Sequence, residues 1–454
     1  MASSLRKNGW TRPKTRDEVL ALAQEQKIRF ILLQFTDILG VAKNVAVPVE
    51  QLGAALNGEI MFDGSSVQGF VRIEESDMLL FPDPTTYMPF PWLNSERGNT
   101  ARLICDILKP NGEPFEGCPR TTLKRAVAEA AALGYTMNAG PEAEFFLFPS
   151  DEEGRPVLRS HDQGGYFDLS PVDRGEEARR DMVMTLEDVG FDIESAHHEV
   201  APAQHEIDFR YAEAVATADN VMTFKIVVRT VARQHGLHAT FMPKPVYGIA
   251  GSGMHIHQSL FQGERNAFHN PAAPNGLSQV CLHYMAGLLH HARAFTAITN
   301  PLVNSYKRLV PGFEAPVYIA WSERNRSPLI RIPDRRGTGT RIELRSPDPS
   351  SNPYLALAVI LQAGLDGIRR QLIPPAPVNR NIYEMTQEER EQHGIASLPG
   401  RLEEALEELQ ASVVVREALG QHIMEYFVEA KRIEAELYRT HVHNWEVERY
   451  LEVY

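Results

Sequence analysis

Two glutamates separated by one residue lie in a strongly apolar stretch of the chain. Glu142 and Glu144 belong to segment 140–148, which otherwise holds only Gly, Pro, Ala, Phe and Leu. Residues two apart on a strand point to the same face, so the two carboxylates would project together. A hard cation such as Mg²⁺ or Mn²⁺ would relieve their repulsion. From this segment alone, an edge strand with two solvated glutamates is an equally good interpretation.

A second acidic pair flanks a turn. In segment 196–209, Glu199 and Glu206 lie near the ends of two strand-like runs joined by a turn that contains Pro202. A hairpin would bring the two carboxylates close, and a site that gathered both acidic pairs could hold more than one divalent ion. The histidines beside them, taken singly, are more often packing or surface residues.

Segment 251–259 combines glycines with two histidines. The glycines permit a close approach of the backbone to a ligand, and His255 and His257 share one strand face, with Ser259 next in the row. A neutral imidazole binds Mn²⁺ or Zn²⁺. One His beside carboxylates suggests Mg²⁺ or Mn²⁺ rather than a structural zinc centre. By itself, a glycine-rich turn with an ordinary His pair is the somewhat commoner interpretation.

Arginines concentrate in the same half of the chain. Segment 308–345 contains Arg308, Arg324, Arg326, Arg331, Arg335, Arg336, Arg341 and Arg345. In the run 341–345, the charged residues Arg341, Glu343 and Arg345 alternate with aliphatic ones and so share a strand face. Guanidinium groups match phosphate and carboxylate oxygens bidentately, and arginines together with divalent ions stabilise a transferring phosphoryl group. The alternative is a surface ion-pair network.

Two glycine-containing loops each present one acid. Asp63 lies in loop 63–66, and Glu314 lies in loop 311–316. Either acid could accept a proton or belong to a lid, although Asp and Gly are common in loops and mean little alone.

Composition excludes several classes of function. The 454 residues carry a formal charge of −13, whereas nucleic-acid binding needs a basic face. No apolar run is long enough to span a membrane, and residues 1–16 lack the apolar core of a signal peptide. Three cysteines without C-x-x-C spacing argue against a disulfide framework and suit a reducing cytoplasm. The phosphate-loop, dinucleotide, H-E-x-x-H and kinase H-R-D motifs are absent from the sequence, so a nucleotide would have to be held in another way.

The elements that position these residues are predicted to form an α+β protein. Thr15 and Glu18 form a capping-box signal for a helix to about residue 27. Strands 28–35 and 41–47 are predicted to form a hairpin of a small sheet, in an N-terminal unit that ends near residues 110 to 120. Helices are predicted at 121–133, 176–189, 219–235, 278–298 and 353–371, and beyond residue 401. Strands are predicted at 135–148, 193–200, 205–211, 238–242, 254–261, 317–321, 328–333 and 339–346. The mixture indicates a largely antiparallel sheet surrounded by helices. The acidic pairs 403–404 and 407–408 are interpreted as a solvated helix face in preference to a binding surface for a basic partner.

Taken together, these motifs resemble those of glutamine synthetase of the bacterial type I, over essentially the whole chain. The matching runs are 61–66, 140–144, 198–200, 244–245, 251–255, 304–312 and 325–327, in the family's order. The resemblance implies an N-terminal β-grasp domain over 15–110 and a catalytic domain over 118–454 with a curved, mainly antiparallel sheet. It also implies a dodecamer of two hexameric rings, with active sites between neighbouring subunits.

The implied reaction is the ATP-dependent ligation of ammonium to the side chain of L-glutamate through γ-glutamyl phosphate, with two or more Mg²⁺ or Mn²⁺ ions. The residues that match the family's metal ligands are Glu144, Glu199 and Glu206 for one ion, and Glu142, His255 and Glu343 for another. Those that match its ATP site are Glu194, Tyr211, His257, Ser259, Arg326, Arg331 and Arg341. Those that match its glutamate site are Gly251, Arg308, Glu314 and Arg345. Ammonium would be bound by Asp63 of the adjacent subunit with Ser66, Tyr166 and Glu199; Asp63, Glu314 and Arg326 are the expected catalytic residues.

The chain resembles the shorter subclass of the family, which lacks control by adenylylation, although Tyr383 lies where a related subclass is modified. Arg72 matches the position that the shorter subclass uses for feedback inhibition by glutamine. Nitrogen-regulatory transcription factors are further possible partners, and no direct contact with nucleic acid or membrane is expected. One departure is Ala250, because the family usually has Asn before the Gly-Ser-Gly-Met-His run.

Two other functions remain open. The first is a γ-glutamyl ligase for a larger amine, such as a polyamine or ethanolamine, and retention of Asp63, Tyr166 and Glu314 argues against it. The second is a catalytically silent regulatory assembly, which the full set of expected metal ligands and arginines argues against.

Overall fold

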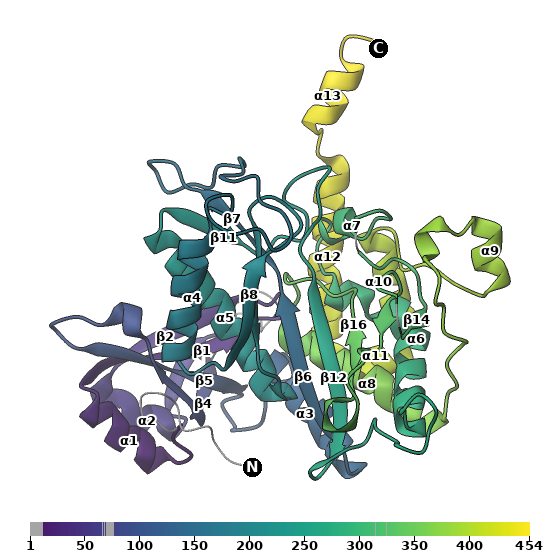
Figure 1. Ribbon diagram of the computed structural model, residues 1–454. Coiled ribbons are helices and arrows are strands. Elements are labelled where there is room, and N and C mark those ends of the chain that lie inside the picture. Colours follow the sequence, from purple (N-terminus) through teal and green to yellow (C-terminus); the bar gives the residue numbers. More distant parts are fainter. Residues whose placement is uncertain (1–11, 66, 68, 70–76, 314, 324) are drawn as a thin grey trace.

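The computed structural model describes residues 12–65, 67, 69, 77–313, 315–323 and 325–454 (Figure 1). The N-terminal part is a five-stranded sheet in the order β2-β1-β5-β4-β3. Its strands are β1 (Ile28–Thr36), β2 (Ala42–Pro48), β3 (Ile60–Asp63), β4 (Asp77–Pro89) and β5 (Asn99–Leu108), flanked by α1 (Arg16–Glu25) and α2 (Leu52–Leu56). Strands β1 and β5 are parallel, and the other pairs are antiparallel. The predicted capping box of Thr15 and Glu18 is confirmed at the start of α1.

The larger part contains two sheets that lie next to each other. The seven-stranded sheet has the order β10-β6-β12-β16-β15-β14, with β13 beside β12, and the four-stranded sheet has the order β11-β7-β9-β8. The strands of the first are β6 (Thr136–Ala143), β10 (Ala212–Glu213), β12 (Met254–Gln262), β13 (Arg265–Asn266), β14 (Trp321–Ser322), β15 (Ile330–Arg331) and β16 (Ile342–Leu344). Those of the second are β7 (Phe145–Pro149), β8 (Ile193–His198), β9 (Gln204–Phe209) and β11 (Leu237–Thr240). Only the β14–β15 pair is parallel among these strands, so the predicted antiparallel character is confirmed.

Helices cover the sheets and extend the chain beyond them. They are α3 (Pro119–Ala132), α4 (Glu176–Asp188), α5 (Ala214–Gln234), α6 (Gln279–Thr299), α7 (Ser305–Arg308), α8 (Pro353–Arg370), α9 (Gln387–Gln392), α10 (Leu402–Ala411), α11 (Val413–Leu419), α12 (Gln421–Thr440) and α13 (Asn444–Tyr450). A Cβ at Gly287 of α6 would lie 2.2 Å from the carbonyl oxygen of Ala363 of α8. Glycine therefore lets these two central helices cross closely. In Figure 1, α13 stands away from the body of the molecule at the end of α12. Across the described ranges, no helix has the length and apolarity that crossing a membrane requires.

Two predictions about the strands differ from the structure. The single strand expected at 135–148 is two strands, β6 and β7, which belong to different sheets and are separated only by Glu144. The strands expected at 317–321, 328–333 and 339–346 are reduced to the short strands β14, β15 and β16. Prolines at 316, 328, 333 and 347 interrupt the backbone hydrogen bonding around them.

The acidic face predicted beyond residue 401 is only partly solvated. Glu403 and Glu407 are exposed, as predicted. Glu404 and Glu408 instead form ion pairs of 2.6 and 2.8 Å with Arg293 of α6, so the solvated interpretation was wrong for them. These ion pairs hold α10 against α6, whose Arg293 precedes the two glutamates by more than a hundred residues.

Candidate active site

A cavity of about 440 Å³ lies where β6, β12 and β16 of one sheet meet β8 and β9 of the other, and we call it the basin. Of the residues expected to act, the basin is lined by Glu142, Glu144, Tyr166, Glu199, Glu206, His255, His257, Arg326, Arg331, Arg341, Glu343 and Arg345. Residues from segments up to two hundred positions apart are thus brought to one place. Strand β6 pairs with β12 at Glu142 and with β10 only at residues 138–139, and the Glu142 carboxylate contacts His255 and His257, so it is not a merely solvated glutamate.

One group of potential metal ligands joins three strands of the larger sheet. Glu142, His255 and Glu343 each offer an atom, and these atoms lie within 4.8 Å of one another. His255 is directly opposite Glu142 in the β6–β12 register. Its Nδ1 lies 3.6 Å from Glu142 Oε2 and 3.9 Å from Glu343 Oε1. These are the three residues that the family resemblance implies as ligands of one ion.

A second group sits on the β8–β9 hairpin. His197 Nδ1 lies 3.5 Å from Glu199 Oε1, and its Nε2 lies 3.3 Å from Glu206 Oε1. Glu144 lines the same basin, but its Oε2 accepts hydrogen bonds from Gln204 Nε2 at 2.7 Å and from the backbone N–H of Gly253 at 2.9 Å. The geometry therefore groups Glu199 and Glu206 with His197 more closely than with Glu144.

Two arginines share the Glu343 carboxylate. Arg331 Nη1 donates to Glu343 Oε2, and Arg345 Nη1 donates to Oε1, each at 2.5 Å. Burial opposes ionisation of Glu343, but the charges of Arg345 and the neighbouring cationic groups outweigh it and lower its pKa. Glu343 therefore stays ionised, and it holds the two guanidinium groups at the edge of the basin.

The carboxylates of the basin differ in how well the protein itself stabilises their charge. Burial raises the pKa of Glu144 to about 7, despite the charge of Arg308. Burial and the charge of Asp208 raise the pKa of Glu206 well above its ordinary value. For Glu142, hydrogen bonds from His255 and His257 overcome burial and lower the pKa. Buried acids whose negative charge the protein compensates only in part, set among His and Glu side chains, suit a bound divalent cation. The residues present thus fit Mg²⁺ or Mn²⁺.

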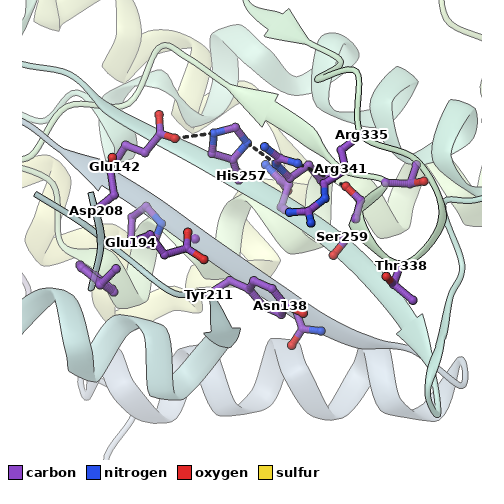
Figure 2. A pocket seen from close by; sticks show the side chains of 16 residues that line it. Asn138, Glu142, Glu194, Asp208, Tyr211, His257, Ser259, Arg335, Thr338 and Arg341 are labelled. Carbon is purple, nitrogen blue, oxygen red and sulfur yellow. Dashed lines mark hydrogen bonds and ion pairs between the residues drawn. The ribbon is translucent and has the colours of Figure 1, made fainter. Parts of the chain in front are cut away.

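A second pocket opens beside the basin and is shown in Figure 2. We call it the side pocket. Five of the residues expected to bind a nucleotide line it, namely Glu194, Tyr211, His257, Ser259 and Arg341. Arg341 Nε donates to His257 Nδ1 at 3.0 Å, and His257 Nε2 lies 2.8 Å from Glu142 Oε1. Because a guanidinium can only donate, the proton of a neutral His257 must be on Nε2, where it is donated to Glu142.

A third and smaller cavity, which we call the Arg308 cavity, adjoins the basin and shares several lining residues with it. It is lined by Gly251, Arg308 and Arg345 of the expected glutamate site, and also by Ala250. Arg308 is 3% exposed, and it donates to the backbone oxygens of Ser346 and Arg345. A Cβ at Gly251 would lie 2.3 Å from the oxygen of Pro243. Glycine at position 251 therefore allows this segment to pack closely against the backbone of Pro243. This packing role is additional to the predicted close approach of the backbone to a ligand.

The residues expected around ammonium are only partly assembled within one chain. Tyr166 lines the basin. Asp63 is exposed at the end of β3, and it lines none of the three cavities defined above. Ser66, Arg72 and Glu314 lie outside the described residues, so their expected roles stay predictions.

Several lining residues were missed by the sequence interpretation. They are His197 in the basin, Gln204 in the smaller cavity, Asn138 and Thr338 in the side pocket, and Asp208 in both the basin and the side pocket. Arg335 of the side pocket belongs to the predicted concentration of arginines but was given no role of its own. Asp208 could have been found, since it follows Glu206 by two residues on a strand and must share its face. Asn138 faces Ser259 across the β6–β12 pairing, and nothing in the sequence alone indicates that pairing.

Comparison with known proteins gives consistent matches over nearly the whole chain. Residues 27–110 match the glutamine synthetase β-grasp domain, and residues 116–450 match the glutamine synthetase catalytic domain. A glutamine synthetase of Staphylococcus aureus (strain MW2) is 58% identical over 97% of this chain and 99% of its own length. One from Thermus thermophilus is 59% identical with the same coverage.

Solved structures agree with these matches. The GmaS–ADP complex superimposes with a TM-score of 0.87 at 33% identity, over 96% of this chain and 99% of that one. Glutamine synthetase of Plasmodium falciparum superimposes with a TM-score of 0.86 at 25% identity, over 97% and 99% of the two chains.

Proposed function

The chain belongs to the glutamine synthetase family, and from this premise we infer that it is a glutamate–ammonia ligase. It joins ammonium to the side-chain carboxylate of L-glutamate and converts ATP to ADP and phosphate. The observation that carries this function is the basin itself, where acids, histidines and arginines converge between the side pocket and the Arg308 cavity.

We propose that the side pocket takes the nucleotide and that the basin takes the transferring phosphoryl group. The metal ligands would be Glu142, Glu144, Glu199, Glu206, His255 and Glu343. Bound Mg²⁺ or Mn²⁺ supplies positive charge that neutralises the phosphate oxygens. Arg326, Arg331 and Arg345 add their own charge at the basin, where it offsets the charge that develops during transfer.

The glutamate would lie between the basin and the Arg308 cavity. Arg308, Gly251 and Arg345 would orient it so that a side-chain oxygen faces the γ-phosphorus. That oxygen forms the new bond to phosphorus as the bond to ADP breaks, which gives γ-glutamyl phosphate. Ammonia then attacks the acyl carbon, and phosphate leaves.

Ammonium is proposed to bind next to Tyr166 and Glu199. Asp63 of an adjacent subunit would complete this site with Ser66 and accept the proton that ammonium loses. Glu314 would close the site against water, which would otherwise hydrolyse the acyl phosphate. The Asp63 side chain is exposed, which supports the proposal that it contributes to the active site of a neighbouring subunit.

We propose a homo-oligomer, in the form of a dodecamer of two rings. Large apolar side chains are exposed on and around α13, including Trp445 at 60%, Leu451 at 75% and Tyr454 at 98%. Such a cluster favours a contact with another chain. Feedback inhibition through Arg72 and binding of nitrogen-regulatory transcription factors are proposed on family resemblance alone. A cytoplasmic location is proposed because Cys105, Cys118 and Cys281 are unpaired and buried.

The proposed function is tested by measuring glutamine and phosphate together, with glutamate, ATP and ammonium in the presence of Mg²⁺ or Mn²⁺. Equal amounts of the two products are expected, and both should be lost in a Glu314→Ala variant. A panel of larger amines, including a polyamine and ethanolamine, runs in parallel. A clear preference for one of them would overturn the choice of ammonium, and absence of ATP turnover by the assembled protein would point to a silent assembly.

A further inference from the structure

Four residues line both the side pocket and the basin, and they mark the junction of the two cavities. They are Glu142, Asp208, His257 and Arg341. Three of the four were expected to act. Asp208 was not, yet the polyphosphate of a nucleotide that reaches from the side pocket into the basin must cross this junction.

The fold positions Asp208 as a continuation of the basin's acids. Glu206 and Asp208 are two residues apart on β9, so their side chains leave the same face of the hairpin. Ser195 of β8 is the cross-strand partner of Asp208, and its hydroxyl donates to Asp208 Oδ2. The other oxygen, Oδ1, is buried and has no hydrogen-bond partner within the described part of the chain.

The side pocket carries opposite charges at its two ends. In Figure 2, Glu142, Asp208 and Glu194 lie at one end of the side pocket, and Arg341 and Arg335 lie toward the other. Glu142 is already engaged with His255 and His257. Asp208 has only the neutral hydroxyl of Ser195 for a hydrogen-bond donor among the described residues. An anionic group in this position repels polyphosphate unless a cation lies between them, in which case it attracts the metal–nucleotide complex.

We propose that Asp208 is a further binding residue of the active site, and that it holds the divalent cation that accompanies the nucleotide at the junction, directly or through one water. Asp208 thereby sets how strongly nucleotide binding depends on that cation. The inference rests on the proposed function, since it takes the side pocket to be the nucleotide site.

The test is the binding of a non-hydrolysable ATP analogue to the assembled protein, measured by calorimetry at saturating and at limiting Mg²⁺. Wild-type protein is expected to bind the analogue far more tightly at saturating Mg²⁺. In Asp208→Asn, affinity at saturating Mg²⁺ should fall about tenfold, as for loss of a supporting group at a metal site. Affinity at limiting Mg²⁺ should instead rise, because the repelling charge has gone. This readout does not depend on turnover.

Two further variants separate this role from a structural one. Asp192→Asn is the matched control, because Asp192 is on the same hairpin but pairs with Arg210 in solvent; its Mg²⁺ dependence should equal that of wild type. Ser195→Ala removes only the hydroxyl that orients Asp208 and should weaken the Mg²⁺ dependence by a smaller factor in the same direction. It tests the inference even if Asp208→Asn does not assemble.

The inference is overturned if Asp208→Asn keeps the wild-type Mg²⁺ dependence, or if it loses affinity equally at both Mg²⁺ levels. Failure of the wild-type protein to bind the analogue at all would refute the proposed function instead, so the two failures can be told apart.

Discussion

At the scale of single residues, the hydrogen bonds of His257 decide what it can offer to a ligand. Arg341 donates to Nδ1, and Nε2 faces Glu142. With both ring nitrogens engaged, the imidazole has no lone pair left for a cation in this arrangement. It acts by orienting Glu142, whose carboxylate remains a candidate ligand. His255, two residues earlier on β12, lies between Glu142 and Glu343 and is the better histidine ligand.

Ala250 gives a prediction for substrate affinity. It lines the Arg308 cavity and packs against the small cluster that contains Phe146 and Phe148. Ala250→Asn should lower KM for glutamate about three- to tenfold, because one added hydrogen bond is worth roughly 0.5–1.5 kcal/mol. Steady-state kinetics with glutamate as the varied substrate check this, with kcat unchanged. Ala250→Leu, which adds no hydrogen bond, should not lower KM. An unchanged KM in the Asn variant would contradict the prediction and would mean that the segment around residue 250 needs no added hydrogen bond to bind glutamate.

Lys225 gives a prediction for stability and pH. It is buried in α5, and its Nζ donates to the backbone oxygen of Ser351 at 3.3 Å. Burial and the charge of Arg229 lower its pKa from 10.5 to about 7. Between pH 7 and about pH 10 the unfolded chain therefore binds more protons than the folded protein, and the stability due to this group rises with pH. Below pH 7 the cost of burying the amine stays at its full value.

Lys225→Met should therefore be more stable than wild type at pH 7. Its advantage should shrink as the pH rises toward 10, by at most about 1.4 kcal/mol per pH unit. Thermal unfolding midpoints of the two proteins across this range measure the difference. A difference that stays constant with pH would show that Lys225 titrates normally in the folded protein.

At the scale of elements, Arg120 joins the small sheet to the helices of the catalytic part. Its guanidinium pairs with Asp83 of β4 at 2.8 Å, Asp106 of β5 at 3.0 Å and Asp219 of α5 at 2.9 Å, and the side chain is 4% exposed. Arg120→Met would leave these acids without their common partner, at a cost of about 3–5 kcal/mol. Lys124→Met, which removes a half-exposed partner of Asp106 only, should cost under about 1 kcal/mol. Thermal unfolding compares them, and equal losses would contradict this role.

The elements also show what the sequence could and could not predict. Long periodic segments, such as α6 and β12, were placed within one or two residues because their apolar pattern is strong, and α6 also begins after a capping residue, Ser278. The passage from β6 to β7 was not predicted, since the apolar residues on both sides of Glu144 read as one strand. The pairing of β9 with β7 rather than β6 depends on contacts between distant segments. Glu142, Glu343 and His255 could be named as candidates from their residue types and spacing, whereas Asn138 and Thr338 join the site only through the fold.

At the scale of the whole molecule, the C-terminal segment should determine the size of the assembly. Each large apolar side chain that becomes buried between subunits contributes about 1.5–3 kcal/mol. A Trp445→Glu, Leu451→Glu double variant should therefore give a smaller species in sedimentation velocity. Glu448→Gln, an exposed change on the same helix, should leave the sedimentation coefficient unchanged. Sedimentation of the double variant at the wild-type rate would exclude this segment from the interface.

The single residue that separates β6 from β7 has a mechanical consequence. Glu144 is the only residue between two strands of different sheets, and its backbone N–H is fixed to the oxygen of Gly253 at 3.0 Å. The two sheets are joined directly at this residue, so a rotation of one sheet against the other would displace Glu144, which is one of the proposed metal ligands. Because no loop separates the two sheets at this residue, we expect catalytic motion to occur mainly in the loops around the cavities rather than between the sheets.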